Sequence, residues 1–233
     1  MPDFIVIGSG IAAASAAFFL ADHGKVILLD RDAAPTPQPG DGPETVVWSA
    51  YHREPACSAL LTCSRAFFET HAPPLSSPLV RLEQLEQFST PQSAPARCLM
   101  TARDAHALCS TLRVEKIEGA LYETDALDID VEVLRQGFLS GLSEKGSAVV
   151  YGATVHGIFR SSRAWRVLTA ATNFTAPILV NAAGAWCDEV AKAASIRPVG
   201  IASTRRTAFA LKLPNGDMAL GALSMRATSL AGL

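Results

Sequence analysis

Three small residues at fixed spacing, Gly8, Gly10 and Ala13, form the pattern with the clearest chemical meaning in this chain. They follow a continuous apolar run, Phe4 to Ile7, which is typical of a parallel strand buried on both faces. The first glycine permits a tight turn, the second lets a pyrophosphate approach the backbone, and the alanine keeps the next helix close to the sheet. The N–H groups that begin this helix add donors and positive partial charge. The pattern therefore predicts a dinucleotide site.

An acidic residue stands at the distance that this pattern requires. The segment from Lys25 to Leu29 reads as a second buried strand, and Asp30 ends it, 22 residues after Gly8. A carboxylate about 20 residues beyond the glycines accepts hydrogen bonds from the ribose hydroxyls of a dinucleotide. Its charge repels a 2′-phosphate, so FAD or NAD is favoured over NADP. A helix over 11–23, ended by Gly24, is expected to join the two strands. A turn that only packs a helix against a sheet is the less favoured interpretation.

A second turn of small residues occurs near the end of the chain. The apolar residues 178–180 run into Asn181-Ala182-Ala183-Gly184-Ala185-Trp186, and a helix is expected to follow. Small residues at such a position again indicate backbone that lies close to a ligand. Before it, Asp130 is expected to cap a helix that ends at Gly146 and has one apolar face, formed by Val131, Leu134, Phe138 and Leu142.

Composition excludes several classes of function. The chain has 233 residues, 49% of them hydrophobic, and a formal net charge of −2, which allows one large or two small domains. Charges of both signs are interspersed, so no basic face for nucleic acid is expected. No apolar run near the N-terminus reaches the roughly 20 residues of a membrane span. The cysteines and histidines are scattered, without the spacing of metal ligands or a disulfide framework. We expect a cytoplasmic protein without a metal.

Several stretches together resemble one family of flavoproteins. They are IGSGIAAASAAFFL…LLDRD, CSRAFFETH, ALDIDVEVLRQGFLSGL, VNAAGAWCDEVA and RPVGIASTRRTAFAL, and they cover most of residues 3–211. They are similar to the FAD-dependent D-amino-acid oxidase/dehydrogenase family, which includes glycine and sarcosine oxidases, and most of all to its bacterial D-arginine dehydrogenases. The resemblance implies an α/β fold. A Rossmann-like FAD-binding domain would comprise 1–45 and 128–200, and an incomplete antiparallel-sheet substrate domain 46–127 and 201–233.

The resemblance also implies the cofactor, the reaction and the residues that hold the cofactor. Such enzymes bind FAD and oxidise the Cα–N bond of a small-molecule amino acid by hydride transfer to the flavin, after which the imine hydrolyses. Three groups of residues would bind FAD: the pyrophosphate would lie on Gly8, Gly10 and Ala13, the adenosine on Asp30, Arg31 and the backbone of Val155, and the second turn would contribute Ala183, Gly184 and Trp186.

Candidate catalytic residues follow from the same resemblance. If the proline-rich stretch 35–43 contains an insertion, His52 matches the active-site histidine of the family, whereas an ungapped alignment places Pro43, Glu44 and Val47 there. Arg206 is the candidate for holding the substrate carboxylate with its two-pronged guanidinium. Its neighbour Arg205 would point to the other face of a strand, and both are alternatively surface residues.

Two further features leave the function open. Glu83 and Glu86 lie near the expected position of an acid that faces a basic substrate, but their spacing equally suits a solvent-exposed face. Family members continue well beyond the position of Ala210, whereas residues 211–233 match nothing expected there, so we expect a C-terminally truncated chain. The alternatives are an inactive remnant that binds FAD or another nucleotide without turnover, and an NAD-dependent dehydrogenase, which the NAAGAW stretch disfavours. The sequence leaves the oligomeric state open.

Overall fold

The computed structural model describes residues 1–33, 45–48, 55–71, 80–81, 97–108, 113–116, 119–123 and 127–202. By internal contacts the chain divides into two units. The first unit comprises 1–44 and 131–206, and the second comprises 45–130 and 207–233. The first is therefore assembled from two segments that are far apart in the sequence.

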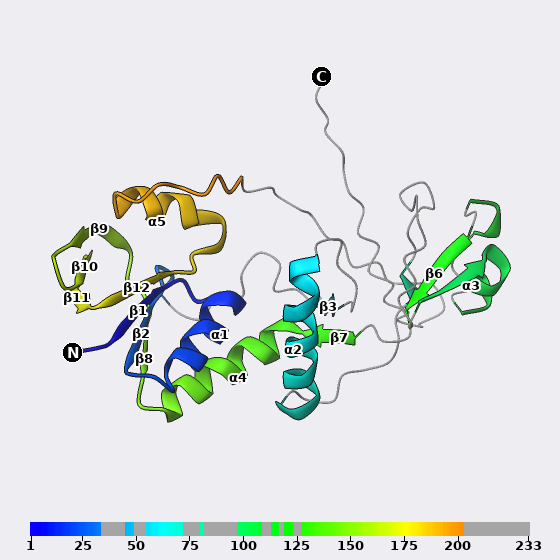
Figure 1. The fold of residues 1–233 in the computed structure, drawn as a ribbon, viewed down its shortest axis with the longest axis horizontal. Helices are drawn as coiled ribbons and strands as arrows, with labels where there is room; N and C mark the ends of the chain where they lie inside the picture. The colour runs from blue at the N-terminus through cyan, green and yellow to red at the C-terminus, as the bar shows by residue number, and fades with distance from the viewer. Residues whose placement is uncertain are drawn as a thin grey trace, which may run out of the picture. The chain divides into compact units, whose positions relative to one another are not determined.

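The first unit is built around a four-stranded parallel sheet with the strand order β12-β1-β2-β8 (Figure 1). The strands are β1 (Phe4–Ile7), β2 (Val26–Leu29), β8 (Ala148–Val150) and β12 (Ile178–Asn181). Ile7 lies in register with Leu29 and with Asn181, so β1, β2 and β12 end at the same edge of the sheet. All four residues of β1 are buried, because the sheet is covered on both faces. The strands predicted at 4–7, 25–29 and 178–180 are confirmed to within one residue.

Two helices, α1 (Ile11–Leu20) and α4 (Val131–Glu144), lie side by side in this unit (Figure 1). The rings of Phe18 and Phe138 are 5.4 Å apart between the helices. Gly141 makes room for this contact, because a Cβ there would lie 2.6 Å from a ring carbon of Phe18. At the far end, Lys145 Nζ donates to Phe18 O at 3.1 Å and pairs with Asp22 at 2.6 Å. Polar contacts thus reinforce apolar packing between α1 and α4.

The predicted helix boundaries hold with one adjustment. Helix α1 ends at Leu20 rather than at residue 23, because residues 21–24 already form the turn into β2. Lys25 N–H donates to the Asp3 carboxylate at 2.8 Å, which ties this turn to the start of β1. Helix α4 buries Phe138 and Leu142 as predicted, and Gly146 follows it with a φ of +74°.

A second layer packs on the parallel sheet. It contains the antiparallel strands β9 (Val155–Arg160), β10 (Trp165–Thr169) and β11 (Asn173–Ala176). The short helices η3 (Gly184–Trp186) and α5 (Cys187–Ala193) follow β12, and α5 lies across the sheet from α1 and α4 in Figure 1. One apolar cluster joins the layers; its buried members are Ile5, Ile7, Leu29, Ala153, Ile158, Val167 and Ala176. The parallel sheet therefore lies inside the unit.

The described residues of the second unit form antiparallel sheets and helical segments. Strand β3 (Thr45–Trp48) pairs with β7 (Leu127–Asp130), and β6 (Gly119–Glu123) pairs with both β4 (Val80–Arg81) and β5 (Arg97–Thr101). The helical segments are α2 (Pro55–His71), α3 (Ala102–Leu108) and η2 (Val114–Lys116). Every strand pair described in this unit is antiparallel, which confirms the α/β prediction with a parallel and an antiparallel part. None of the helices in the described ranges combines the length and apolarity needed to cross a membrane.

Gly8 is a position where the fold of the first unit tolerates no side chain. Its φ is +110°, and a Cβ there would lie 2.5 Å from the backbone oxygen of Ala182. We expect Gly8→Ala to lower the free energy of unfolding by about 3 kcal/mol or more, from ~1–2 kcal/mol of left-handed strain and ~1–3 kcal/mol of overlap.

Gly146 provides the matched control, because it also has a positive φ but no described atom lies within 4 Å of an added Cβ. Gly146→Ala should lower the free energy of unfolding by only about 1–2 kcal/mol. Urea unfolding of the two variants measures the difference. Equal losses would contradict the contact between Gly8 and Ala182.

Candidate dinucleotide-binding site

The turn Gly8-Ser9-Gly10 follows β1 and leads into α1, whose N-terminus has no side-chain cap. Gly10 is the N-cap of α1; no side chain caps the first N–H groups, and the first turn holds no acidic residue. A Cβ on Gly10 would meet no atom of the described chain within 4 Å, so the backbone borders open space. Free N–H donors and the helix dipole both favour an anion at such a terminus. The turn therefore offers unpaired N–H donors and open space beside Gly10, and phosphate binding there stays a prediction.

Ser9 lies between the two glycines and is nearly buried, with 6% of its surface exposed. Its carbonyl accepts a hydrogen bond from Arg135, but its hydroxyl makes none within the described part of the chain. A buried hydroxyl without a partner is unfavourable, so such groups commonly bind water or a ligand. The Ser9 hydroxyl is therefore a further group that a phosphate oxygen would satisfy.

The second turn, residues 181–184, is hydrogen-bonded directly to the end of β1. Ala182 N–H donates to Ile7 O at 3.0 Å. Asn181 holds the turn in shape, because its Nδ2 donates to Cys187 O at 2.8 Å and its Oδ1 accepts from Ala183 N–H at 3.4 Å. Gly184 has a φ of +56°, with no described atom within 4 Å of an added Cβ. The two glycine-containing turns thus meet at the carboxyl edge of the sheet.

Asp30 is fixed at the same edge, one strand away. It is buried, with 5% exposure, and its Oδ1 accepts from Asp32 N–H at 2.8 Å. Its backbone is held by β8 and the residues that follow: Asp30 N–H donates to Val150 O at 2.9 Å, and Ala153 N–H donates to Asp30 O at 2.6 Å. Among the described residues, Asp32 supplies the one hydrogen bond to this carboxylate, which leaves its second oxygen available for a ribose hydroxyl.

Arg31 and Trp186, which both belong to the predicted site, are in direct contact. The guanidinium carbon of Arg31 lies 3.9 Å from the centre of the Trp186 ring. Arg31 also lies 3.7 Å from Asp32, with about half of its side chain exposed. A guanidinium stacked on an indole is attracted to the negative face of the ring. A cation–π contact therefore joins the end of β2 to η3, directly after the second turn.

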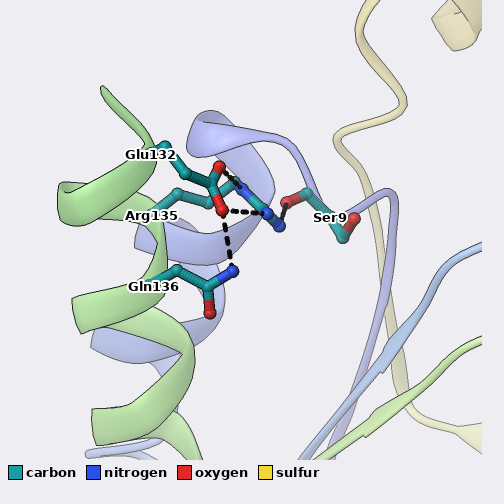
Figure 2. Close-up of polar contacts among 4 residues, drawn as sticks. All are labelled: Ser9, Glu132, Arg135 and Gln136. Atoms are coloured by element: carbon teal, nitrogen blue, oxygen red, sulfur yellow. Dashed lines mark hydrogen bonds and ion pairs between the residues drawn. The ribbon is translucent and has the colours of Figure 1, made fainter. Parts of the chain in front are cut away.

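A polar cluster on α4 contacts the first turn, and sequence reasoning missed it (Figure 2). Arg135 is buried and donates from Nε and Nη2 to the two carboxylate oxygens of Glu132, at 2.8 and 2.7 Å. Its Nη1 donates to Ser9 O at 3.4 Å, and Gln136 Nε2 donates to Glu132 at 2.8 Å. The signal that could have revealed the cluster is an arginine next to the apolar face of the predicted helix, three residues after an acid.

Ionisation in this cluster responds to the arginine and to burial. The pKa of Glu132 is lowered, chiefly because Arg135 donates hydrogen bonds to it, while burial opposes the change. The pKa of Tyr151 is raised, first by burial; the charge of Arg135 opposes the rise, and the charges of Asp30 and Glu132 add to it. Tyr151 follows β8 and lies in the field of both Asp30 and the α4 cluster.

The remaining predicted residues are placed as follows. Ala13 is fully buried in α1. Val155 begins β9, packs against the core cluster, and lies two residues after Ala153, which contacts Asp30. Its role toward adenine stays a prediction. The other candidates lie outside the described residues; they are His52, Glu83, Glu86, Arg205 and Arg206.

Comparison with known proteins assigns the family. The family described as FAD dependent oxidoreductase (DAO) matches residues 3–229. The chain belongs to this family. FAD is accordingly the cofactor of the family to which it belongs, and the predicted relationship is confirmed at this level.

Three of the solved structures with a similar fold show the extent of the likeness. Glycine oxidase from Geobacillus kaustophilus has a TM-score of 0.69 at 17% identity, over 83% of this chain and 58% of that one. L-proline dehydrogenase from P. horikoshii has a TM-score of 0.68 at 17% identity, over 83% of this chain and 56% of that one. FAD-bound L-α-glycerophosphate oxidase from Mycoplasma pneumoniae has a TM-score of 0.68 at 14% identity, over 83% of this chain and 57% of that one. The chain thus spans somewhat more than half the length of each.

The described residues of this family member fit the ADP part of FAD. The fit rests on the uncapped start of α1, the open space beside Gly10, the unpartnered buried hydroxyl of Ser9 and the buried carboxylate of Asp30. These groups offer donors to a diphosphate and an acceptor to a ribose, which matches the polarity of each part of the ligand.

The lowered pKa of Glu132 leads to a prediction about acid sensitivity. The ion pair stabilises the fold above the ordinary pKa of glutamate, and this contribution is lost as pH falls through the lowered folded-state value. Because 38% of the Glu132 side chain is exposed, the contribution at pH 7 should stay below about 1 kcal/mol. Glu132→Gln should therefore have a lower melting temperature than the wild type at pH 7, with the gap closing toward pH 3. A gap that does not change with pH would contradict the ion pair.

Proposed function

We propose that this chain is part of an FAD-dependent oxidoreductase that oxidises the Cα–N bond of a D-amino acid, with a D-arginine-like substrate favoured. The single observation that carries the cofactor part is the meeting of two open glycine turns beside a buried acid at one edge of a parallel sheet. Support for the substrate comes from the sequence resemblance to D-arginine dehydrogenases. Because the structural neighbours include enzymes for glycine, proline and glycerophosphate, the shared fold leaves the substrate open.

The proposal gives each residue of the site a task toward FAD. Gly8, Gly10 and the start of α1 would hold the diphosphate, and Ala13 lets α1 lie close to the sheet. Asp30 would accept from the ribose, with Arg31 and the backbone of Val155 beside the adenosine. Ala183, Gly184 and Trp186 would line the cofactor from the second turn. Residues 1–45 and 128–200 would form the FAD-binding domain, and 46–127 with 201–233 the partial substrate domain.

The chemistry divides between the cofactor and the chain. FAD, when bound, accepts the hydride that leaves Cα, and water hydrolyses the resulting imine. In the chain, Arg206 would hold the substrate carboxylate through two parallel N–H donors. His52 would face the substrate beside the flavin, and Glu83 or Glu86 would pair with a basic substrate side chain. These three assignments follow the family pattern. The proposed cytoplasmic location rests instead on the composition of the chain.

A remnant that binds FAD without turnover is the second candidate. It rests on the same groups beside Gly10, Ser9 and Asp30, because these could bind a nucleotide without any catalytic residue. An NAD-dependent dehydrogenase is a third possibility, because Asp30 suits the ribose of either dinucleotide, and the NAAGAW stretch disfavours it. Binding and turnover measurements separate the three.

FAD binding should depend on the open space beside Gly10. The φ of Gly10 is −62°, which valine can adopt, and no described atom lies near an added Cβ. Gly10→Val should therefore fold but fill the path of the diphosphate, so we expect FAD affinity to fall by about a hundredfold or more, as for a loss of ~3 kcal/mol. Gly137→Val, which adds the same bulk to an exposed position of α4, is the control. Calorimetry that shows equal FAD affinity in Gly10→Val and wild type would contradict the site.

Turnover distinguishes the enzyme from the remnant. We expect D-arginine, and not L-arginine, to reduce an artificial electron acceptor when the FAD-loaded chain is fused to the C-terminal part of a full-length family member. The 233-residue chain alone should be at least about a hundredfold slower, because a reacting atom misplaced by ~1 Å costs that much. Equal rates would show that the chain suffices. No reduction by any D-amino acid in either protein would contradict the proposed substrate class.

A further inference from the structure

Arg135 lies where it can control the shape of the phosphate-binding turn. It comes from α4, whereas the turn joins β1 to α1, so the contact links segments that are 126 residues apart in the chain. Only 4% of the Arg135 surface is exposed, and its Nη1 donates to the carbonyl oxygen of Ser9 (Figure 2). A buried arginine is costly unless its donors are satisfied, so this placement requires a specific role.

We propose that Arg135 is a positioning residue of the cofactor site, which orients the Ser9–Gly10 peptide so that the Gly10 N–H faces the diphosphate. This inference rests on the FAD site proposed above. In a planar trans peptide the C=O and N–H groups point in opposite directions. With Ser9 O held toward Arg135, the Gly10 N–H must point away from α4. It donates to no group in the described part of the chain, and the space beside Gly10 is open.

The need for such a residue follows from glycine itself. Gly10 lets the ligand approach because it lacks a Cβ, but the same lack makes its backbone conformation permissive. A peptide that rotates between orientations would present its N–H to the ligand only part of the time, and ordering it on binding would weaken affinity. A hydrogen bond from Arg135 to Ser9 O removes this freedom before the ligand arrives.

Glu132 and Gln136 make Arg135 a fixed donor and remove most of its net charge from the site. Glu132 accepts two hydrogen bonds from the guanidinium, and Gln136 donates to Glu132 from one helical turn further on. All three lie on α4 at spacings of three and four residues, which places them on one face of the helix. Because the carboxylate neutralises the guanidinium, Arg135 acts on the turn mainly through geometry. The affinity for a diphosphate should therefore depend on salt concentration to the same degree in Arg135→Met as in the wild type.

Lys145 offers a matched control on the same helix pair. It also donates to a backbone carbonyl of α1, Phe18 O, and pairs with an acid, Asp22, but at the end of α1 remote from the turn. Lys145→Met should lower the melting temperature through the lost α1–α4 contacts. Its affinity for ADP should remain within about twofold of the wild type.

The experiment compares ADP with adenosine as probes of the full 233-residue chain. Arg135→Met keeps much of the side-chain length but donates no hydrogen bond. We expect its ADP affinity to fall about tenfold or more, the size expected for a hydrogen bond to a charged group, while adenosine affinity stays within about twofold. Arg135→Lys should recover only part of the loss, because an ammonium lacks the planar fork that reaches Ser9 and Glu132 together. In the ligand-free protein, the Gly10 amide resonance should shift in Arg135→Met and not in Lys145→Met.

The outcomes separate this inference from the proposed function. If wild type binds ADP and Arg135→Met binds it equally well, the positioning role is wrong and the FAD site stands. Equal losses for ADP and adenosine would also overturn the role, because they indicate general disruption. If wild type binds neither FAD nor ADP, both the proposed site and this inference fail. Should Arg135→Met not fold, Arg135→Lys and Glu132→Gln replace it, and unchanged ADP affinity in both would overturn the inference.

Discussion

The close approach of Gly8 to the Ala182 carbonyl is the constraint on which the first unit depends. Parallel pairing of β1 with β12 places the last residues of the two strands side by side. The turns that follow the two strands must therefore lie close to one another. Without a Cβ on Gly8, the backbones can touch; with one, the Cβ would lie 2.5 Å from a carbonyl oxygen. This contact allows both glycine turns to share one edge of the sheet. The two turns can therefore border a single extended ligand.

Polar contacts then stabilise this surface from several sides. Arg135 holds the first turn from α4, Asn181 holds the second turn internally, and the backbone of Asp30 is hydrogen-bonded to β8 and the residues after it. Most of these contacts involve backbone atoms. They therefore orient peptide groups, and they do not bring additional side chains into contact with a ligand. A dinucleotide diphosphate, which is bound largely by backbone N–H groups, suits a site of this kind. Arg31 and Trp186 add a cation–π contact between the end of β2 and η3, directly after the second turn.

Membership of the FAD dependent oxidoreductase family agrees with this division of tasks in the first unit. In such flavoproteins the redox chemistry belongs to the cofactor, and the parallel sheet would supply a rigid support for the ADP part of FAD in the proposed site. The second unit, with its antiparallel strand pairs, has the architecture expected of a substrate domain. His52 and Arg206, the residues proposed to contact the substrate, lie outside the described residues.

Local sequence determined the parts of the site that depend on near neighbours in the chain. The apolar runs 4–7 and 25–29, the G-x-G-x-x-A spacing and Asp30 were predictable, because a strand, a turn and a helix in succession place these residues by backbone geometry alone. The apolar face of α4 was predictable for the same reason, since side chains three and four residues apart share one face of a helix. The resemblance of longer stretches then predicted the family, which the match over residues 3–229 confirmed.

Only the tertiary structure decided which distant residues meet. Arg135 was not recognised as part of the site, because its importance comes from Ser9, which α1–α4 packing brings to it. Gly8 was predicted as a turn residue, but its contact with Ala182 requires the pairing of β1 with β12. The stacking of Arg31 on Trp186 likewise depends on the strand order, which places β1 between their two strands. Contacts of this kind arise when packing of the whole unit brings separate elements together, and the periodicity of one segment carries no information about them.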